Sequence, residues 1–242
     1  MITTTITARE RLTEPDIRAM FALHRRYFAG TCNERFRHDL AEKDWVITLH
    51  DTAALAGFST QKLITLADRP EVRFLFSGDT IVDRPYWNQP GLAGGWGHLA
   101  MKLAAEREGC GNLYWFLICK GFRTYRFLPT FFRHYYPRPG NADDAVAFNP
   151  ILDTVAAARY GSAYNPARGV IRSSGTGDRL ADGWTDIAPH HATDPHIAYF
   201  LAANPGWRDG DELACLAPIT RDNLNPLGHR VIRTTGVAWN VD

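Results

Sequence analysis

Apolar and polar positions in the middle of the chain follow the order of a strand, a loop, a helix and a second strand. Residues 72–77 alternate as β-forming residues do, until Gly78, whose missing side chain favours a bulge. Residues 80–82 resume the extended pattern, and apolar residues recur at helical spacing over residues 96–104. Residues 113–119 are apolar without interruption, which is typical of a central strand covered on both faces.

The residues before this unit predict a strand, two helices and a hairpin. Residues 2–8 are rich in Ile and Thr and predict a strand towards an edge of the sheet. Residues 13–30 predict a helix, because a capping hydroxyl, an early proline and first-turn acids begin it and a glycine ends it. A shorter amphipathic helix is expected over residues 34–43. Residues 45–49 and 55–60 read as the two strands of a hairpin.

The second half of the chain is less regular. Residues 137–150 are typical of a loop, and helical spacing returns over residues 151–160. Residues 161–183 have few large apolar side chains and many Gly, Ser and Asp, which indicates an insertion or lid. Three elements are expected after it: a helix over residues 195–201 and strands over residues 213–219 and 230–233.

Composition indicates a globular chain with a substantial core. The chain has 242 residues, 45% of them hydrophobic, and a formal net charge of +1. We interpret this length as a single domain. The nearly neutral balance gives no sign of a nucleic-acid partner or an anionic membrane partner.

Targeting and metal-binding signals are weak. No apolar run approaches the ~20 residues that span a bilayer, and residues 1–5 do not resemble a signal peptide, so we expect a cytoplasmic protein without a membrane partner. Four cysteines are scattered and predict reduced thiols: Cys32, Cys110, Cys119 and Cys215. Three histidines lack supporting ligands, so no metal site is expected at His190, His191 and His196.

Residues 120–138 interleave cations with aromatic side chains and contain no acid. Such a segment can cover the core with its rings while its arginines pair with acids elsewhere. It can also bind single-stranded nucleic acid by stacking and charge. A third interpretation is a cationic rim for an anionic donor, which fits its position beside the central loop.

The order of a strand, two helices, a hairpin and a bulged strand before a loop–helix–strand unit resembles the GNAT superfamily of N-acyltransferases. In that family the pantetheine arm of acyl-CoA lies where the bulged strand splays from the next one. The family motif is Arg or Gln, two residues, Gly, one residue, and Gly or Ala. Gly95 and Gly97 align with its last two positions, and Leu92 stands where the polar residue belongs.

The resemblance implies one α/β domain over residues 1–242, with a GNAT-like mixed central sheet flanked by helices. Residues 120–194 would then be a mostly helical insertion or lid. The implied activity is transfer of an acyl group from a thioester, either acyl-CoA or an acyl carrier protein, to an amine on a small molecule or a protein. An acidic carrier protein would be a partner, and nucleic acid is disfavoured.

The resemblance also implies which residues lie near the donor. Strand residues beside the splay would contact the pantetheine, and helix-start amides would face its phosphates. Lys120 and Arg123 would supply positive charge at the rim. The expected donor-binding residues are Ile81, Val82, Gly94, Gly95, Gly97, His98, Lys120 and Arg123.

Two side chains are candidates for proton transfer. Asp79 follows the bulge in an otherwise apolar strand, where a carboxylate needs a partner, so we predict a base acting directly or through water. A structural alternative is a carboxylate that caps the bulge amides. Tyr199 stands on a late helix, where the family resemblance implies a general acid; a core tyrosine is the alternative. Cys119 is interpreted as a buried small hydrophobe and not as a nucleophile.

A second class of function stays open at this point. The chain could have kept the fold and lost the cofactor loop, and so act as a non-catalytic binding module. Its partner would be a protein or single-stranded RNA on the surface of residues 120–138.

Overall fold

The computed structural model describes residues 1–106, 111–140, 142–175, 177–187, 191 and 193–241. Within these ranges, one mixed sheet has the strand order β11-β1-β3-β4-β5-β6-β10-β8-β7. Its strands are β1 (Ile2–Ala8), β3 (Trp45–Asp51), β4 (Ala54–Leu66), β5 (Arg69–Val82), β6 (Asn112–Cys119), β7 (Tyr164–Asn165), β8 (Val170–Ile171), β10 (Glu212–Pro218) and β11 (Val237–Asn240). A separate pair joins β2 (Phe28–Ala29) to β9 (Arg179–Leu180).

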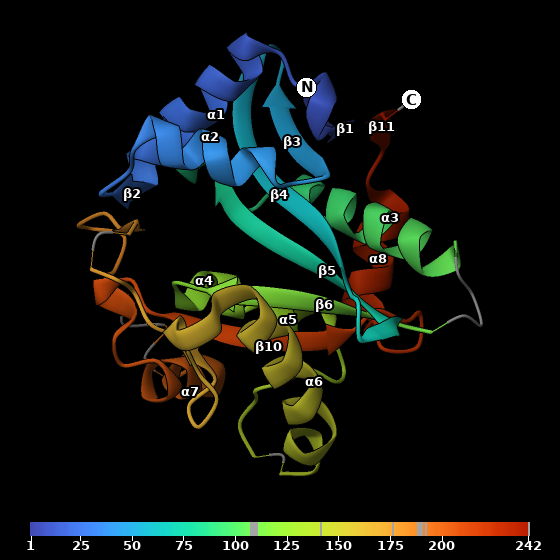
Figure 1. The fold of residues 1–242 in the computed structure, drawn as a ribbon. Helices are drawn as coiled ribbons and strands as arrows, with labels where there is room; N and C mark the ends of the chain where they lie inside the picture. Colours follow the sequence, from blue (N-terminus) through green and yellow to red (C-terminus); the bar gives the residue numbers. More distant parts are fainter. Residues whose placement is uncertain (107–110, 141, 176, 188–190, 192, 242) are drawn as a thin grey trace.

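Helices cover both faces of the sheet (Figure 1). They are α1 (Glu14–Tyr27), α2 (Asn33–Ala41), α3 (Gly91–Ala105), α4 (Phe122–Tyr125), α5 (Phe127–Phe131), α6 (Ala142–Tyr160), α7 (Pro195–Ala203) and α8 (Pro226–Thr234). Apolar side chains of α1 and α2 pack with those of β3, β4 and β5, and α6 packs on β5, β6 and β10. The opposite face is covered by α3, α4, α5 and α7 in the largest apolar cluster. The prediction of an α/β fold with a mixed central sheet flanked by helices is confirmed.

Most predicted elements are present, and the start of α1 has the expected chemistry. The Thr13 hydroxyl accepts from the Asp16 amide while the Asp16 side chain accepts from the Thr13 backbone, so both ends of a capping box are in place. The hairpin of β3 and β4 and the central strand β6 are also confirmed. In β6 the side chains from Leu113 to Leu117 are all buried.

β1 lies towards an edge of the sheet as predicted, between β3 and the edge strand β11, which pairs with it in parallel. Three predictions were wrong. Residues 230–233 belong to α8, which begins where the Asn225 side chain accepts from the Gly228 amide. Helix α6 starts at Ala142, inside the expected loop, and α3 starts at Gly91 instead of near residue 96.

Residues 120–194 were expected to form an inserted, mostly helical segment. They hold α4, α5 and α6, but β7 and β8 within them extend the main sheet beside β10. β9 reaches across to β2, at the end of α1. The segment therefore contributes to both the sheet and its cover. Among the described residues, no helix combines the length and apolar character that a bilayer crossing requires.

Candidate active site

The main sheet divides where β5 and β6 separate. These parallel strands pair from Val72 and Asn112 as far as Ser77 and Leu117, where the pairing ends. Beyond that point β5 continues along β4, and β6 continues along β10. Figure 1 shows the two strands together on the right and diverging towards the left. The two halves of the sheet thus form a wedge that opens at the carboxyl ends of β5 and β6.

The predicted bulge lies at the start of this wedge and is confirmed. Ser77 faces Gln61 and Thr80 faces Ser59, so two residues of β5 stand opposite one residue of β4. A Cβ atom at Gly78 would lie 2.6 Å from the hydroxyl oxygen of a β4 threonine and 2.8 Å from a lysine methylene. Only glycine fits at this position without displacing its neighbours.

Backbone amides of β5 face the open side of the wedge. The Asp83 amide donates to the Ala56 carbonyl on β4 at 2.8 Å. Because amide directions alternate along a strand, the Ile81 amide also points to β4, and those of Thr80 and Val82 point to the side that β6 has left. The Val82 carbonyl accepts from the Trp87 indole at 2.8 Å. The Thr80 and Val82 amides are thus placed to meet an extended ligand in the wedge.

We expect Val82→Pro to weaken binding of the thioester donor that the family resemblance implies by about twofold to tenfold, the effect of losing one hydrogen bond worth ~0.5–1.5 kcal/mol. The substitution removes an amide that points away from β4, so the β4–β5 ladder stays intact. Titration calorimetry with S-acetyl-pantetheine measures the loss, and Val82→Ala, which keeps the amide, is the control for the side chain. Ile81→Pro should instead destabilise the fold, by about 1–3 kcal/mol in urea unfolding. Equal donor affinity in Val82→Pro and Val82→Ala would contradict the assignment.

A chain of buried hydrogen bonds crosses β6, β5 and β4 at the bulge. The Trp115 indole donates to Ser77, Ser77 donates to Gln61, and the Gln61 amide donates to Ser59, at 2.9, 2.8 and 2.6 Å. The Thr80 hydroxyl donates to the Gly78 carbonyl, so Ser59 must donate to Thr80 across 2.7 Å. The hydroxyl hydrogens of this chain are therefore all used within it. The unpaired indole N–H of Trp96, which also lines the pocket, and the backbone amides remain as donors that can polarise a carbonyl at the wedge.

A pocket opens from the wedge on the face covered by α3. It has about 590 Å³ of empty space, part of which is open to solvent. Ser77, Thr80 and Leu117 lie where the strands part, and residues of α3, α5 and α8 complete the wall.

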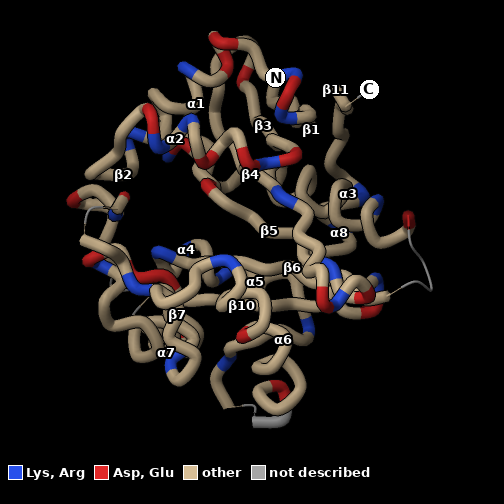
Figure 2. Tube along the Cα trace, in the orientation of Figure 1, with Lys and Arg blue, Asp and Glu red and all other residues tan. Residues whose placement is uncertain are grey.

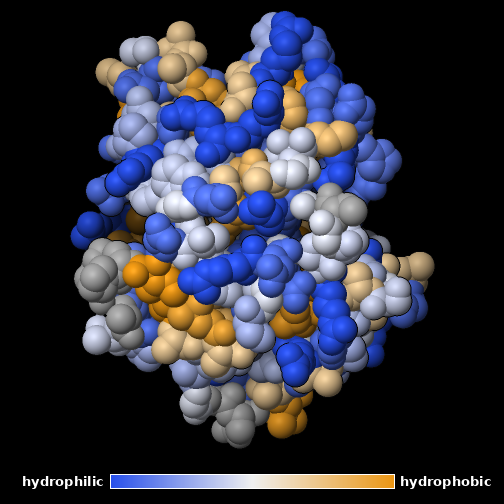
Figure 3. Space-filling model, turned by 90° about the vertical axis from the view of Figure 1, so that its left-hand side faces the viewer, coloured by the Kyte–Doolittle hydropathy of each residue, from blue (hydrophilic) through white to orange (hydrophobic). Residues whose placement is uncertain are grey.

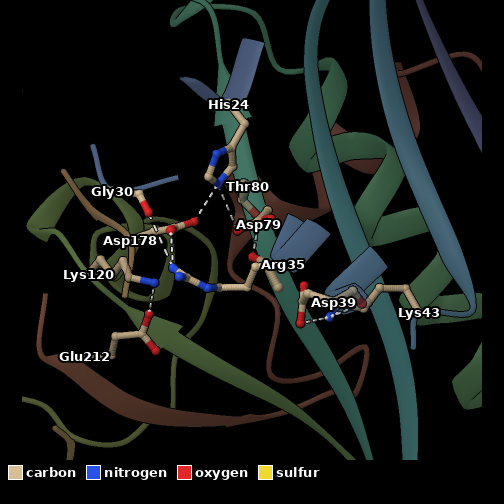
Figure 4. Close-up of polar contacts among 11 residues, drawn as sticks. His24, Gly30, Arg35, Asp39, Lys43, Asp79, Thr80, Lys120, Asp178 and Glu212 are labelled. Atoms are coloured by element: carbon tan, nitrogen blue, oxygen red, sulfur yellow. Dashed lines mark hydrogen bonds and ion pairs between the residues drawn. The ribbon is translucent and has the colours of Figure 1, made fainter. Parts of the chain in front are cut away.

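The opposite face of the same strand carries a cluster of charged residues (Figure 4). The Asp79 carboxylate and the Asp178 carboxylate each lie 3.6 Å from Nε2 of His24. His24 comes from α1 and is 1% exposed, while Asp79 is 26% exposed. Arg35 of α2 donates to Asp178 at 3.1 Å. Neighbouring side chains of a strand face opposite ways. The Asp79 carboxylate therefore lies on one side of the wedge, and Thr80 faces the pocket on the other side.

The charges around Asp79 keep it ionised. Burial alone would raise its pKa, but the contact with His24 and the positive charges of Lys120 and Lys43 outweigh this effect, and the pKa lies below the usual value. Asp178 differs, because burial raises its pKa, and the opposing charges of His24 and Lys120 only partly compensate. Two nearby carboxylates with pKa values moved in opposite directions are typical of sites that move protons.

Lys120 belongs to this cluster. Its ammonium lies 2.5 Å from Glu212, and its side chain is 29% exposed. Burial would lower the pKa of Lys120, but Glu212, Asp79 and Asp178 together raise it. The residue is therefore a charged member of the acidic cluster, at the carboxyl end of β6, where the wedge is widest.

The other donor-side candidates lie in different surroundings. Arg123 donates to the Trp184 carbonyl at 2.8 Å and stacks over Trp87 at 5.0 Å, beside the loop that follows β5. His98 contacts the Thr235 carbonyl at 3.0 Å. Ile81 points into the apolar cluster under α1 and α2.

The glycines of α3 serve close packing. The Gly94 amide donates to Pro90 at 2.8 Å, so it is used within the helix and does not face the donor phosphates. A Cβ atom at Gly94 would lie 2.0 Å from Thr235, and one at Gly95 would lie 2.7 Å from a sheet isoleucine. Gly97 lies against Ile232 of α8 and also lines the pocket. The first-turn amides of α3 begin at Gly91, earlier than the expected 94–97 site.

Tyr199 is not among the residues that the structure brings to the wedge. It stacks on Tyr125 at 6.2 Å within the apolar cluster between α4 and α7. Burial raises the pKa of Tyr199 to about 12. Cys119 is fully buried 3.9 Å from the sulfur of Cys215, and burial raises its pKa well above the usual value, so its thiol stays protonated.

The basic and aromatic residues of 120–138 have the contacts of the first interpretation, in which the rings cover the core and the arginines pair with acids elsewhere. Its buried aromatic side chains are Phe122, Tyr125, Phe132 and Tyr135. Arg126 pairs with Asp194 at 3.3 Å, and Arg138 pairs with Asp144 at 2.5 Å. Cationic and acidic segments are interspersed along the chain in Figure 2. Figure 3 views the side where the wedge opens, and a band of hydrophilic residues crosses the middle of that face.

Sequence analysis missed four residues of the charged cluster: His24, Arg35, Asp178 and Glu212. His24 had a detectable signal, since it is a polar residue on the apolar face of α1. Asp178 had none, because only the pairing of β2 with β9 brings its segment to α1. No group of three or more His, Cys, Asp or Glu side chains suited to a metal occurs among the described residues, and His190 lies outside them.

No protein-family model and no curated protein matches the chain. Solved structures with similarity include the ribosomal-protein-S18-alanine N-acetyltransferase from Escherichia coli, 15% identical over 90% of this chain and 95% of that one, with a TM-score of 0.39. The GNAT family N-acetyltransferase YhbS from Escherichia coli, in complex with CoA, is 16% identical over 50% of this chain and 64% of its own, with a TM-score of 0.33. Arabidopsis thaliana NAA60, in complex with a bisubstrate analogue, is 16% identical over 55% and 86% of the two chains, with a TM-score of 0.35. The first two of these neighbours bear the names of N-acetyltransferases.

Proposed function

We propose that this chain is an N-acyltransferase that takes its acyl group from a pantetheine thioester and passes it to an amine. The observation that carries the proposal is the wedge between β5 and β6, which begins at the Gly78 bulge and has Asp79 on one side and a pocket on the other. An extended pantetheine arm can lie along the Thr80 and Val82 amides. CoA and an acyl carrier protein both present such an arm.

The chemistry needs a neutral amine and a polarised carbonyl. An acceptor ammonium on the α1 side gives a proton to the Asp79 carboxylate, and the freed amine attacks the thioester carbon through the wedge. Negative charge that develops on the carbonyl oxygen faces the amides at the open edge of β5. Collapse breaks the carbon–sulfur bond, and the thiolate leaves with the pantetheine arm and takes the second proton, which the nitrogen loses as the amide forms. A thiol with a pKa near ~8.5, as in cysteine, leaves readily as the thiolate. This step therefore does not depend on Tyr199, and the role of Tyr199 as a general acid stays a separate prediction.

Binding and turnover test this proposal together. Titration calorimetry would compare acetyl-CoA, S-acetyl-pantetheine and a single-stranded oligonucleotide, and thiol release with a panel of primary amines would measure transfer. Binding of either thioester with amine-dependent thiol release supports the proposal. Heat with the oligonucleotide alone would contradict it. Strong salt dependence of a carrier-bound donor, relative to acetyl-pantetheine, would point to a carrier protein meeting Lys120 and Arg123.

Asp178→Asn is expected to lower kcat/KM for the amine by about 10-fold to 100-fold, because charge-assisted contacts are worth ~1.5–3 kcal/mol. Asp178 shares His24 with Asp79 and presents the second carboxylate to a cationic acceptor. Thiol-release kinetics at varied amine measures the effect, and donor affinity should not change. The matched control is Asp182→Asn, which alters a fully exposed acid of the same segment. Equal losses in the two variants would remove Asp178 from the acceptor side.

A further inference from the structure

The pocket beside the wedge has an apolar and aromatic wall. None of the described residues that line it is charged. Four side-chain hydroxyls are present, and the hydrogens of Ser59, Ser77 and Thr80 are already used in the chain of hydrogen bonds at the bulge. The remaining large lining side chains are Leu92, Trp96, Trp115, Leu117, Phe127, Phe131, Phe132, Leu224, Val231 and Ile232.

The pocket lies at the narrow end of the wedge. Ser77 and Leu117 are the last paired residues of β5 and β6, and both line the pocket. The other end is charged, where Lys120 follows β6 in an ion pair with Glu212 and Arg123 stacks beside the loop after β5. A donor whose phosphates or carrier stay at the wide, charged end would therefore direct its acyl group towards the narrow, apolar end.

We propose that this pocket binds the acyl chain of the donor, and that the chain is a medium-length apolar acyl group and not acetyl. The inference rests on the proposed function, because it assigns the pantetheine arm to the wedge. An acetyl group would leave most of the apolar wall in contact with water. A chain of several methylenes would cover it and would need no polar partner.

The proposal makes a quantitative demand on donor binding. Each methylene that enters an apolar pocket contributes ~0.8 kcal/mol, which corresponds to about fourfold in affinity. Affinity should therefore rise about fourfold per added methylene from acetyl through butyryl, hexanoyl and octanoyl, and then level off when the pocket is full. If only the pantetheine arm contacted the protein, the affinity would be the same for every acyl chain length.

Titration calorimetry with the S-acyl-pantetheine series tests this on the full chain, with the thiol form of pantetheine as the reference. Two variants change the pocket in opposite directions. Ala93→Leu adds volume to the wall and should move the levelling point to a shorter chain, and Phe131→Ala removes volume and should move it to a longer one. Ala105→Leu makes the same change as Ala93→Leu at an exposed position of α3 and should leave the series unchanged. Thermal unfolding checks that each variant is folded.

The outcomes separate the two proposals. A rise in affinity with chain length that shifts in the two pocket variants supports the acyl pocket. Chain-independent binding with acetyl transfer intact would overturn the pocket assignment and leave the acyltransferase proposal standing. If no S-acyl-pantetheine of any length binds, both proposals are wrong. A length dependence that Ala105→Leu alters as much as Ala93→Leu would also overturn the pocket assignment.

Discussion

Asp79→Asn is expected to lower the rate of acyl transfer by about 10²–10⁴-fold, the range for loss of a positioned acid–base group. The variant keeps the size of the side chain and the bulge geometry, but it cannot accept the ammonium proton. Thiol release at saturating donor and amine measures the loss. Donor affinity should stay within about twofold, because Asp79 lies on the α1 face and not in the pocket.

Asp68→Asn, in the exposed turn between β4 and β5, is the matched control and should retain full turnover. Full turnover by Asp79→Asn itself would leave the carboxylate with only its structural role at the bulge. Stability against pH gives an independent check. The pKa of Asp79 is lowered in the fold, so its ionised form stabilises the protein above the unfolded pKa of ~3.9, and this contribution disappears as pH falls through the lower folded value. The difference in unfolding free energy between wild type and Asp79→Asn should shrink towards zero in acid.

Gln61→Leu is expected to lower the free energy of unfolding by about 1–3 kcal/mol for each buried partner that it leaves unsatisfied. Gln61 is fully buried, and it accepts from Ser77 and donates to Ser59. Urea unfolding measures the loss, and Gln89→Leu at an exposed loop position provides the control. Donor affinity should fall as well, because Ser59 and Ser77 line the pocket at the wedge.

A Gln61→Leu variant with wild-type stability would mean that the hydrogen-bond chain does not hold the bulge. A variant with wild-type stability but weaker donor binding would mean that the hydrogen-bond chain sets only the shape of the pocket. The single Ser77→Ala variant tests one half of the hydrogen-bond chain, because it removes the acceptor of the Trp115 indole and leaves the Ser59 side chain unchanged.

The wedge could be predicted because its signals are local. Gly78 interrupts an alternating strand, and an unbroken apolar strand follows the next helix, so the bulge and β6 are readable from neighbouring residues. The start of α3 was missed because four glycines within the seven residues 91–97 are typical of a loop. They form a helix here because its backbone must approach the sheet and α8 closely, and Gly94 and Gly97 have no room for a Cβ atom.

The site itself was only partly predictable. Asp79 stood out as a carboxylate in an apolar strand, which is a property of the sequence. Its partners are set by tertiary contacts, because His24 comes from α1 and Asp178 from a segment that a two-residue strand pairing delivers. The 230–233 strand was wrong because two aliphatic residues flanked by arginines, Arg-Val-Ile-Arg, also suit an amphipathic helix, which Asn225 and Pro226 begin.

The packing of α8 on α3 and the pairing of β11 with β1 have a consequence for how the chain acquires its shape. Both contacts join residues that are synthesised at very different times. When β1, β5 and α3 have left the ribosome, two elements have not yet been synthesised. These are α8, which lines the pocket, and β11, which pairs with β1. Such non-local closure slows folding. During that interval the apolar wall is accessible to chaperones and to other unfinished chains.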